Sequence, residues 1–513
     1  MRQAYRRLLV PTLLLAVTIA YNLPILKSAV NTYDEGMILT GAQRILNGDI
    51  PHRDFWTIYP FGQYLTLAFL FKVFGASILT ERVYDLAIKS LLSTVIYGVG
   101  RNVGLSRKLA LSAWGVALIY IGDTELPGYP VYAAILLIFI SVYCFSRYLN
   151  DPRRRYLFIA GIAVAVSSFY RHDLAGMTAI AMIGTLALKM ALEKKLDLKS
   201  MLLLIGGILL AGLPVLIYLD RAVGLSPIVD QLLVSPMETF PKYRYLPYPT
   251  HLAYKSLPFY INPIVLLSGL VVALATLAQQ GNRGRMNYGL LLLSLIGILF
   301  LNQVRIRSDP DHLLPAALLT ASVGAILLHL FIEAARRSPR RIASGWVAPL
   351  IFGPIILPLA SPIVRKYHSL GGDYFSLPKP SPRSGYAYIG NDLKNLATYI
   401  MNHTDRNDPI YVGACNHDRF IVNDPIVYFL TNRAPATRYH DLQPGVATTL
   451  EVQQEIAQEI TEAAPELIVL TSRYWIEPND TRIDLGVDHL DQTILNRYVF
   501  KKKFGHYQVW TIK

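Results

Sequence analysis

Cysteine and charge are both scarce in this 513-residue chain. Its two cysteines are Cys144, inside an apolar run, and Cys415, in a polar stretch, so we expect neither a disulfide framework nor a thiolate zinc site. Charged residues make up only 16% of the chain, against 53% hydrophobic residues, and the mean hydropathy is +0.35. A soluble globular chain rarely keeps such a balance in water. The composition therefore predicts a polytopic α-helical membrane protein.

Apolar runs that approach the roughly 20 residues of a bilayer-spanning helix recur along the chain. The first run follows a basic N-terminus but lacks an A-x-A cleavage motif, which predicts an uncleaved signal anchor. The runs cover residues 8–26, 61–78, 82–100, 107–122, 129–149, 155–170, 173–192, 200–219, 258–279, 287–303, 312–332 and 345–364.

The net charge of +14 would suit a nucleic-acid-binding protein, but its distribution favours another interpretation. Basic residues cluster in loops between the apolar runs, and the positive-inside rule places such loops in the cytoplasm. We therefore expect no nucleic-acid partner. The clusters contain Arg2, Arg6, Arg7, Arg101, Arg107, Lys108, Arg153, Arg154, Arg155, Lys194, Lys195, Lys199, Arg283, Arg285, Arg336, Arg337, Arg340 and Arg341.

This orientation requires that one run between residue 60 and the basic cluster at 101–108 does not cross the membrane. We assign that role to residues 61–78, which follow Pro60 and contain Gln63 and Lys72, and expect them to lie in the outer interface. About eleven spans plus interfacial helices remain. We expect a bacterial inner (plasma) membrane location with a cytoplasmic N-terminus.

The C-terminal region has the texture of a soluble α/β domain on the extracytoplasmic side. Apolar stretches at 409–414, 466–472 and 506–513 predict strands, and residues 391–402 and 448–463 predict helices. No G-x-G-x-x-G motif or P-loop follows these strands, so a nucleotide site there has no support. The predicted organisation is a membrane domain at 1–365 with external loops at 27–81 and 220–257, a linker at 366–385 and a soluble domain at 386–513.

Polar side chains gather on the predicted external face, at the ends of the apolar runs. Ionisable residues at such positions are costly and by default indicate function, although each one is also explained as a solvated loop residue or an interfacial anchor. Their clustering is the stronger signal. They are Asp34, Glu35, Arg53, Asp54, Asp123, Glu125, Arg171, His172, Asp173, Arg305, Arg307, Asp309, Asp311 and His312.

The stretch from Tyr33 to Tyr64, which begins YDEG and continues GAQRILNGDIPHRDFWTIYPFGQY, resembles the first external loop of the GT-C superfamily of integral-membrane glycosyltransferases. The order of regions along the chain is similar to that of the protein O-mannosyltransferase and aminoarabinose transferase branch. That resemblance implies transfer of a sugar from a polyprenyl-phosphate donor to a lipid, glycan or protein acceptor. Where the aminoarabinose branch has a lysine before a Pro-Pro pair, this chain has Tyr59 before Pro60.

The resemblance implies that Asp34 is the general base, with Glu35 orienting donor or acceptor. Such a reaction needs a base for the acceptor proton and cations for the departing phosphate. Arginines suit the phosphate, and acid pairs offer oxygen ligands to a possible Mg or Mn ion; no cofactor is certain. The donor phosphate and sugar candidates are Arg53, Asp54, Tyr59, Arg171, His172, Asp173, Arg305, Arg307, Asp309 and His312, and the metal candidates are Asp34, Asp123 and Glu125.

The external loop at 220–257 contains tyrosines interleaved with basic residues. Aromatic faces suit sugar stacking, and Tyr243, Arg244 and Tyr245 are the residues we expect in a flap over the donor groove. Tyrosines also populate membrane interfaces without any ligand.

A transporter or flippase of lipid-linked sugars is the competing hypothesis. It predicts ionisable residues in the middle of spans and inverted repeats. We find no internal repeat in the sequence, and most charges lie at the ends of apolar runs. These observations favour the transferase.

Overall fold

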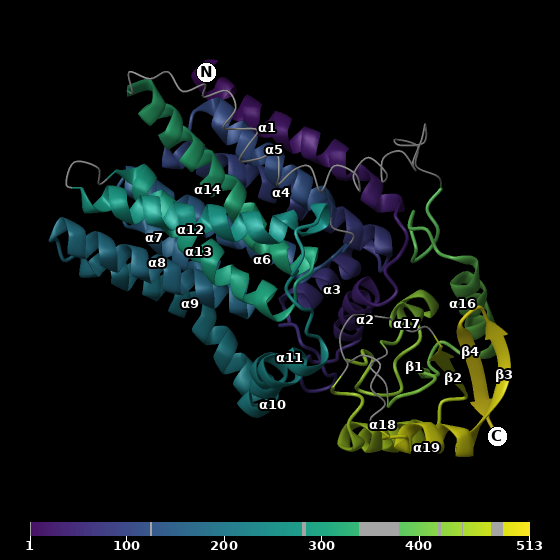
Figure 1. Ribbon diagram of the computed structural model, residues 1–513. Coiled ribbons are helices and arrows are strands. Elements are labelled where there is room, and N and C mark those ends of the chain that lie inside the picture. Colours follow the sequence, from purple (N-terminus) through teal and green to yellow (C-terminus); the bar gives the residue numbers. More distant parts are fainter. Residues whose placement is uncertain are drawn as a thin grey trace.

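The computed structural model describes residues 2–123, 126–279, 284–337, 379–418, 422–443, 445–472 and 486–513. Its helices form an elongated bundle, and a small sheet lies beyond one end of that bundle (Figure 1). The predicted span at 345–364, most of the predicted linker, Glu125 and the side chain of Asp123 lie outside these described positions.

Eight helices of the described chain are long and apolar enough to cross a membrane, which confirms the polytopic membrane fold. Two further predicted spans are shorter helices, α5 (Arg107–Asp123) and α7 (Arg155–Ser168), of 17 and 14 residues. Both are shorter than the roughly 20 residues of a typical span, and because 345–364 lies outside the described residues, the expected number of about eleven spans stays a prediction. The eight helices are α1 (Arg2–Asn22), α4 (Ile78–Val103), α6 (Pro130–Asn150), α8 (His172–Glu193), α9 (Leu198–Ala222), α12 (Leu257–Ala278), α13 (Arg285–Ile306) and α14 (Pro310–Arg337).

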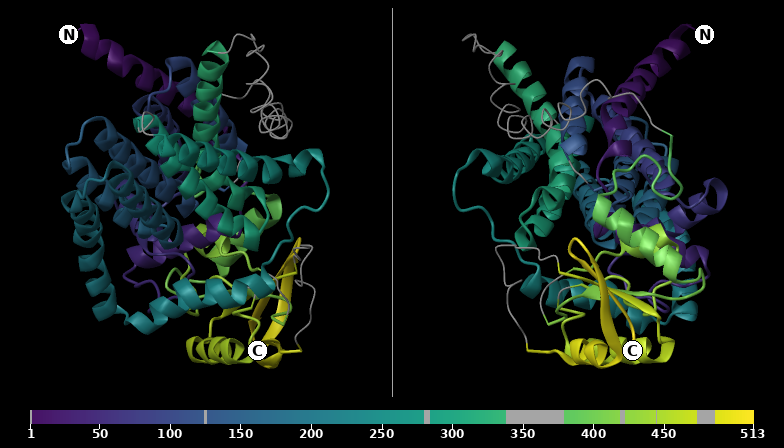
Figure 2. Two further views of the ribbon diagram at one scale, coloured as in Figure 1. Left: turned by 60° about the vertical axis from the view of Figure 1, so that its left-hand side comes forward. Right: turned by 90° about the vertical axis from the view of Figure 1, so that its right-hand side faces the viewer.

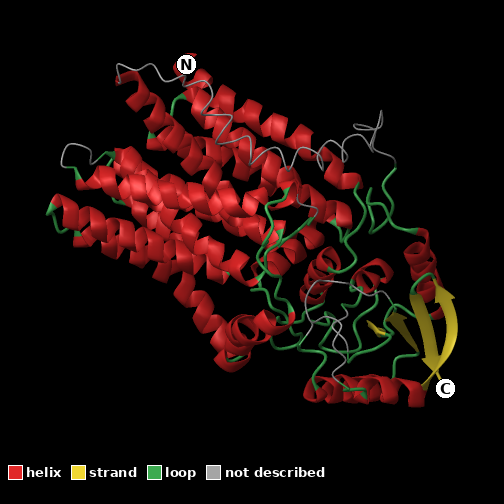
Figure 3. Ribbon diagram, viewed as in Figure 1, coloured by secondary structure: helices red, strands yellow, loops and turns green. Residues whose placement is uncertain are grey.

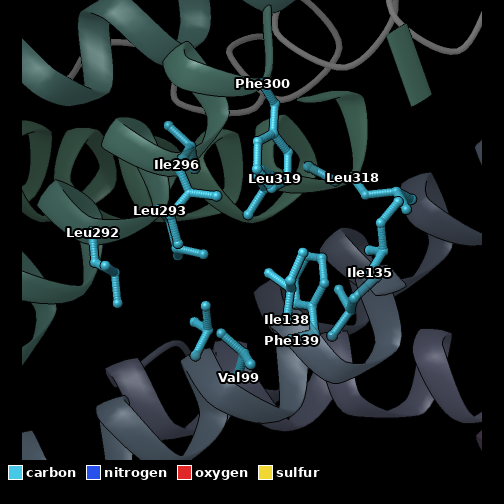
Figure 4. Packing of buried hydrophobic residues seen from close by; sticks show 14 of the residues in the cluster. Val99, Ile135, Ile138, Phe139, Leu292, Leu293, Ile296, Phe300, Leu318 and Leu319 are labelled. Carbon is cyan, nitrogen blue, oxygen red and sulfur yellow. The ribbon is translucent and has the colours of Figure 1, made fainter. Parts of the chain in front are cut away.

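Apolar side chains from α4, α6, α13 and α14 form the main core of the bundle (Figure 4). Val99, Ile138, Leu293 and Leu319 are all fully buried in it. Elsewhere α7 and α9 cross at two glycines. A Cβ at Gly161 would lie 2.1 Å from the Leu204 carbonyl oxygen, so only glycine permits this close approach of the two backbones.

Two short helices lie between the bundle and the C-terminal region: α2 (Asp34–Leu46) and α3 (Gly62–Phe74). Helix α3 has 13 residues and is too short to span a bilayer, in agreement with the interfacial position expected for residues 61–78. Its Leu65, Phe69 and Val73 recur every fourth residue and are exposed, as an apolar face for lipid would be.

The 220–257 segment is partly helical rather than an open loop. A π-helix forms its centre, and Pro236 lies inside this helix. The elements are α10 (Leu225–Val229), η2 (Asp230–Thr239), α11 (Phe240–Tyr243) and the 3₁₀ turn η3 (Tyr254–Ser256); a further 3₁₀ turn, η1 (Leu23–Lys27), follows α1.

The C-terminal region contains a four-stranded sheet with helices beside it, which confirms the α/β character (Figure 3). The strand order is β1-β2-β4-β3; β1 and β2 are parallel, and β4 is antiparallel to both neighbours. Strand β3 was not predicted from the sequence, because its three lysines interrupt the alternation of apolar residues. The elements are α16 (Asn391–His403), β1 (Tyr411–Ala414), α17 (Ile426–Thr431), α18 (Leu450–Ala463), β2 (Leu467–Thr471), α19 (His489–Arg497), β3 (Tyr498–Phe504) and β4 (Tyr507–Ile512).

The C-terminal domain shares a hydrophobic core with α2 and α3. Leu39 of α2 and Tyr64 of α3 are buried in the same cluster as Val412 of β1 and Ile426 of α17. A Cβ at Gly36 would lie 2.4 Å from the backbone nitrogen of Ile426, so α2 and α17 touch backbone to backbone. This domain lies at the opposite end of the bundle from the N-terminus (Figure 2).

Candidate active site

Asp34 is the first residue of α2, and Asn31 fixes its side chain. Asn31 Nδ2 donates to Asp34 Oδ2 at 3.1 Å, and Asn31 Oδ1 accepts from the backbone N–H of Asp34 at 2.8 Å. A carboxylate in the first turn also meets the positive end of the helix dipole. The short YDEG turn thus presents an acid at the junction between bundle and C-terminal domain.

Glu35 points into the protein and pairs with Arg82 of α4. Arg82 Nε donates to Glu35 Oε1 at 2.7 Å and Arg82 Nη2 to Oε2 at 3.0 Å, and both side chains are fully buried. Arg82 Nη1 also donates to the backbone carbonyls of Ile25 and Ser28. These contacts hold α2 against α4 and the η1 turn, and the orienting role of Glu35 stays a prediction.

Arg244, after α11, connects the 220–257 segment to the C-terminal domain. Its Nη1 donates to Gln443 Oε1 at 2.7 Å, and Gln443 Nε2 donates to the Asp441 carboxylate at 3.0 Å. Asp441 and Gln443 are 1% exposed. Tyr243, beside Arg244, packs on Gly445, where an added Cβ would lie 2.1 Å from its ring.

Arg307 joins the same segment to the bundle, where α13 ends and α14 begins. Its Nη1 donates to the backbone carbonyl of Arg244 at 3.0 Å, and its Nε donates to Asp309 Oδ2 at 2.7 Å. His312 contacts the other Asp309 oxygen at 2.7 Å. Burial raises the pKa of Asp309, but the hydrogen bond and charge of His312 and the charge of Arg307 outweigh it and lower that pKa to about 2.

Arg171 supplies a third cation, from the turn between α7 and α8. It forms a bidentate pair with Asp173, whose carboxylate also accepts from Gln303 of α13. Next to it lie Tyr59 and Tyr129, with ring centroids 5.9 Å apart. Burial raises the pKa of both tyrosines, and the positive charge of Arg171 opposes that rise in each.

The electrostatic environment of Asp34 shows that these groups converge. Burial raises the pKa of Asp34, and the positive charges of Arg244, Arg307 and His312 oppose that rise. Burial likewise raises the pKa of Asp441 to about 6, with the charge of Asp34 adding to the rise and Arg244 opposing it. Asp34 of α2 and Asp441 of the C-terminal domain therefore share the cation Arg244.

Other predicted site residues lie apart from this cluster. Arg53 and Asp54 pair with each other at 2.8 Å on an exposed turn. Arg305 is exposed and contacts Asn302 of its own helix, and the Tyr245 side chain is 45% exposed. These four residues lack the converging charges that surround Asp34.

A second contact joins residues 52–57 to η2, and the charge of His172 acts on it. There Gln231 Oε1 contacts His52 Nδ1 at 3.0 Å and accepts from the Thr57 N–H at 3.1 Å. Burial lowers the pKa of His52 to about 4, against the hydrogen bond from Gln231, and the charge of His172 lowers it further. A neutral imidazole at residue 52 thus anchors the loop that precedes Tyr59.

The sequence analysis missed Asn31, Arg82, Asp441 and Gln443. Arg82 falls at the start of an apolar run that also contains Asp85 and Lys89, and charges inside such a run are a recognisable signal. Asp441 and Gln443 carried no signal, because only the fold brings the C-terminal domain to α2.

Among the described residues, no group of three or more His, Cys, Asp or Glu side chains is placed to hold a metal ion. Of the predicted metal candidates, Asp34 is held by Asn31 and surrounded by cations. Glu125 and the side chain of Asp123 lie outside the described residues, so metal binding at this face stays a prediction.

Comparison with known proteins identifies the class of fold. No protein-family model and no curated protein matches the chain. The architecture, with a helical membrane bundle, short helices at its end and a C-terminal α/β domain, is nonetheless found among solved structures, and it is the GT-C fold.

Two similar solved structures are of ArnT from Cupriavidus metallidurans. The structure bound to undecaprenyl phosphate aligns with a TM-score of 0.57 at 13% identity over 97% of both chains. The structure in the apo state aligns with a TM-score of 0.52, again at 13% identity over 97% of both chains. These alignments confirm the predicted GT-C resemblance at the level of the fold.

Proposed function

We propose that the protein is a glycosyltransferase that moves a sugar from a polyprenyl-phosphate donor to an acceptor hydroxyl on the extracytoplasmic face of the membrane. The observation that carries this proposal is the convergence of Asp34 with Arg244, Arg307 and His312 at one end of a GT-C bundle, with Arg171 beside Tyr59 in the same region. The similar fold of ArnT, solved with undecaprenyl phosphate, supports the donor class.

In the proposed reaction the acceptor oxygen attacks the sugar carbon that carries the phosphate. Asp34 takes the proton of the acceptor hydroxyl as the new C–O bond forms. The bond between that carbon and the phosphate oxygen breaks, and its electron pair leaves with the lipid phosphate. Arg171, Arg244 and Arg307 stabilise the negative charge on the phosphate, since guanidinium groups pair well with phosphate oxygens.

The environment of Asp34 suits a base. Burial raises the pKa of its carboxylate and so makes it more basic than an exposed one, while the charges of Arg244, Arg307 and His312 favour its ionised form. The acceptor and the sugar are not specified by these contacts, and lipid, glycan and protein acceptors all offer the required hydroxyl.

The test is sugar transfer by purified protein from a panel of polyprenyl-phosphate sugars to lipid and glycan acceptors. Asp34→Asn is expected to abolish transfer with little change in thermal stability. Asp220 is an exposed acid near the C-terminal end of α9. Asp220→Asn is the matched control and should keep wild-type turnover. Full turnover by Asp34→Asn would remove Asp34 as the base.

One observation favours the transporter alternative. Helix α4 buries Glu81, Asp85 and Lys89 inside a candidate span, and Lys89 Nζ lies 2.8 Å from Asp85. Movement of a lipid-linked sugar across vesicles containing the protein, unaffected by Asp34→Asn, would support that function instead.

A further inference from the structure

The C-terminal domain reaches the site through two buried side chains, Asp441 and Gln443. Gln443 is an amide held between a cation and an anion: its Oε1 accepts from Arg244 Nη1 at 2.7 Å, and its Nε2 donates to both Asp441 oxygens, at 3.3 and 3.0 Å. This arrangement fixes the amide in one orientation, because a flipped amide would turn its donor group toward the guanidinium.

The backbone of Arg244 is held from the opposite side by the bundle. Its carbonyl accepts from Arg307, and Leu246 exchanges backbone hydrogen bonds with Ile306 and Ser308, each at 3.3 Å. The segment from 243 to 246 is therefore fastened to α13 through its main chain and to the C-terminal domain through its side chains. The second attachment contacts the Arg244 guanidinium itself.

We propose that Asp441 and Gln443 are positioning residues of the active site: together they hold the guanidinium of Arg244 beside Asp34, so that the site is complete only with the C-terminal domain in place. The inference rests on the proposed function and adds to it a role for that domain. Neither residue needs to touch substrate, since both act through Arg244.

The charges around Asp34 predict opposite effects for the two residues. The negative charge of Asp441 favours protonated Asp34. Gln443 instead holds the positive charge of Arg244 close, and that charge favours ionised Asp34. The groups whose charges act on Asp34, or respond to it, are Tyr33, Tyr59, Tyr129, Arg244, Arg307, His312 and Asp441.

The main experiment is the pH dependence of kcat/KM for sugar transfer by the full-length protein. Asp441→Asn is expected to move the acid limb to lower pH, and Gln443→Ala to move it to higher pH, each by up to about one unit. Gln458→Ala, an exposed glutamine of the same domain bonded only to Glu462 among the contacts described, is the control and should leave the limb in place. If Asp441→Asn and Gln443→Ala both lower kcat/KM but leave the pH of the acid limb unchanged, the two residues have a merely structural role and the proposal is overturned.

A charge-swapped variant provides the rescue. Asp441→Asn combined with Gln443→Glu keeps one carboxylate and one amide in the pair, and it again gives Arg244 an acceptor. The rate of sugar transfer by the double variant is expected to be at least about tenfold higher than that of Gln443→Ala. A double variant no better than Gln443→Ala would contradict the positioning role.

A stability measurement separates this inference from the proposed function. If the pair holds Arg244, the losses of thermal stability caused by Arg244→Ala and Gln443→Ala are not additive in the double variant. Additive losses overturn the positioning role. Absence of any transfer by the wild-type protein, together with non-additive losses, would overturn the transferase and leave the coupling standing.

Discussion

Arg82 and Glu35 form a bidentate ion pair in which both side chains are fully buried, with N–O distances of 2.7 and 3.0 Å. Arg82→Met is expected to lower the free energy of unfolding by about 3 to 5 kcal/mol, because it leaves the Glu35 carboxylate buried without its partner. Thermal unfolding in detergent measures the change. Adding Glu35→Gln should restore part of the loss, and a double variant less stable than Arg82→Met would argue against the pair as its cause.

Arg307 and Arg305 lie two residues apart and provide a matched comparison. We expect Arg307→Met to reduce kcat for sugar transfer by roughly 100-fold, as the removal of a group that stabilises transition-state charge does. Arg305→Met should remain within about twofold of wild type, since its guanidinium is exposed and bonds to Asn302. Equal losses in both variants would show that Arg307 has no special role.

The pH–rate profile should report Asp34. Transfer requires the ionised carboxylate, so the rate falls as the pH drops through the pKa of this group. Because burial raises that pKa, the acid limb is expected above the value of about 4 found for exposed aspartates. Measurement of kcat/KM between pH 4 and 8 tests this. An acid limb at or below pH 4 would show that another group limits the reaction.

His52 should make the protein sensitive to mild acid. Its pKa in the folded protein is about 4, below its ordinary value of 6.5, so the unfolded chain binds the proton first. Its contribution to stability is then present above pH 6.5 and is lost as the pH falls toward 4, by up to about 3 kcal/mol. Comparing the pH dependence of unfolding in wild type and His52→Gln isolates this term. His403→Gln, at an exposed position, should retain the wild-type curve.

Gly36 sets the contact between α2 and the C-terminal domain. Gly36→Ala places a methyl group 2.4 Å from the Ile426 nitrogen, so α17 has to shift, and we expect a loss of about 1 to 3 kcal/mol. Gly176→Ala in α8 meets no atom within 4 Å and serves as the control. Faster proteolysis of the C-terminal domain in Gly36→Ala alone would confirm the contact, and equal behaviour of both variants would contradict it.

The membrane bundle was predictable because its pattern is local. Apolar runs and basic loops lie within a few residues of each other in the sequence, so most helices occur where the sequence places them. Helices α5 and α7 also form at predicted apolar runs, with 17 and 14 residues. The edge strand β3 was not predicted, since Lys501, Lys502 and Lys503 mask its alternation.

The site was predictable only from its bundle side. Asp34, Arg171 and Arg307 stand at the ends of apolar runs, and that position distinguished them. Glu35 also stands at the end of an apolar run, and only the structure shows that its carboxylate pairs with Arg82. Asp441 and Gln443 belong to the C-terminal domain, more than 400 residues after Asn31, and no local pattern relates them to Asp34.

The shared core of α2, α3 and the C-terminal domain has a consequence for biosynthesis. Helix α2 is made early, yet the groups that bury it, from Pro425 to His440, are among the last fifth of the chain to be synthesised. Asp34 therefore lacks its complete surroundings until the C-terminal domain has docked on α2. Under the proposed function, a truncated or stalled chain would lack a working site and would not consume lipid-linked sugar.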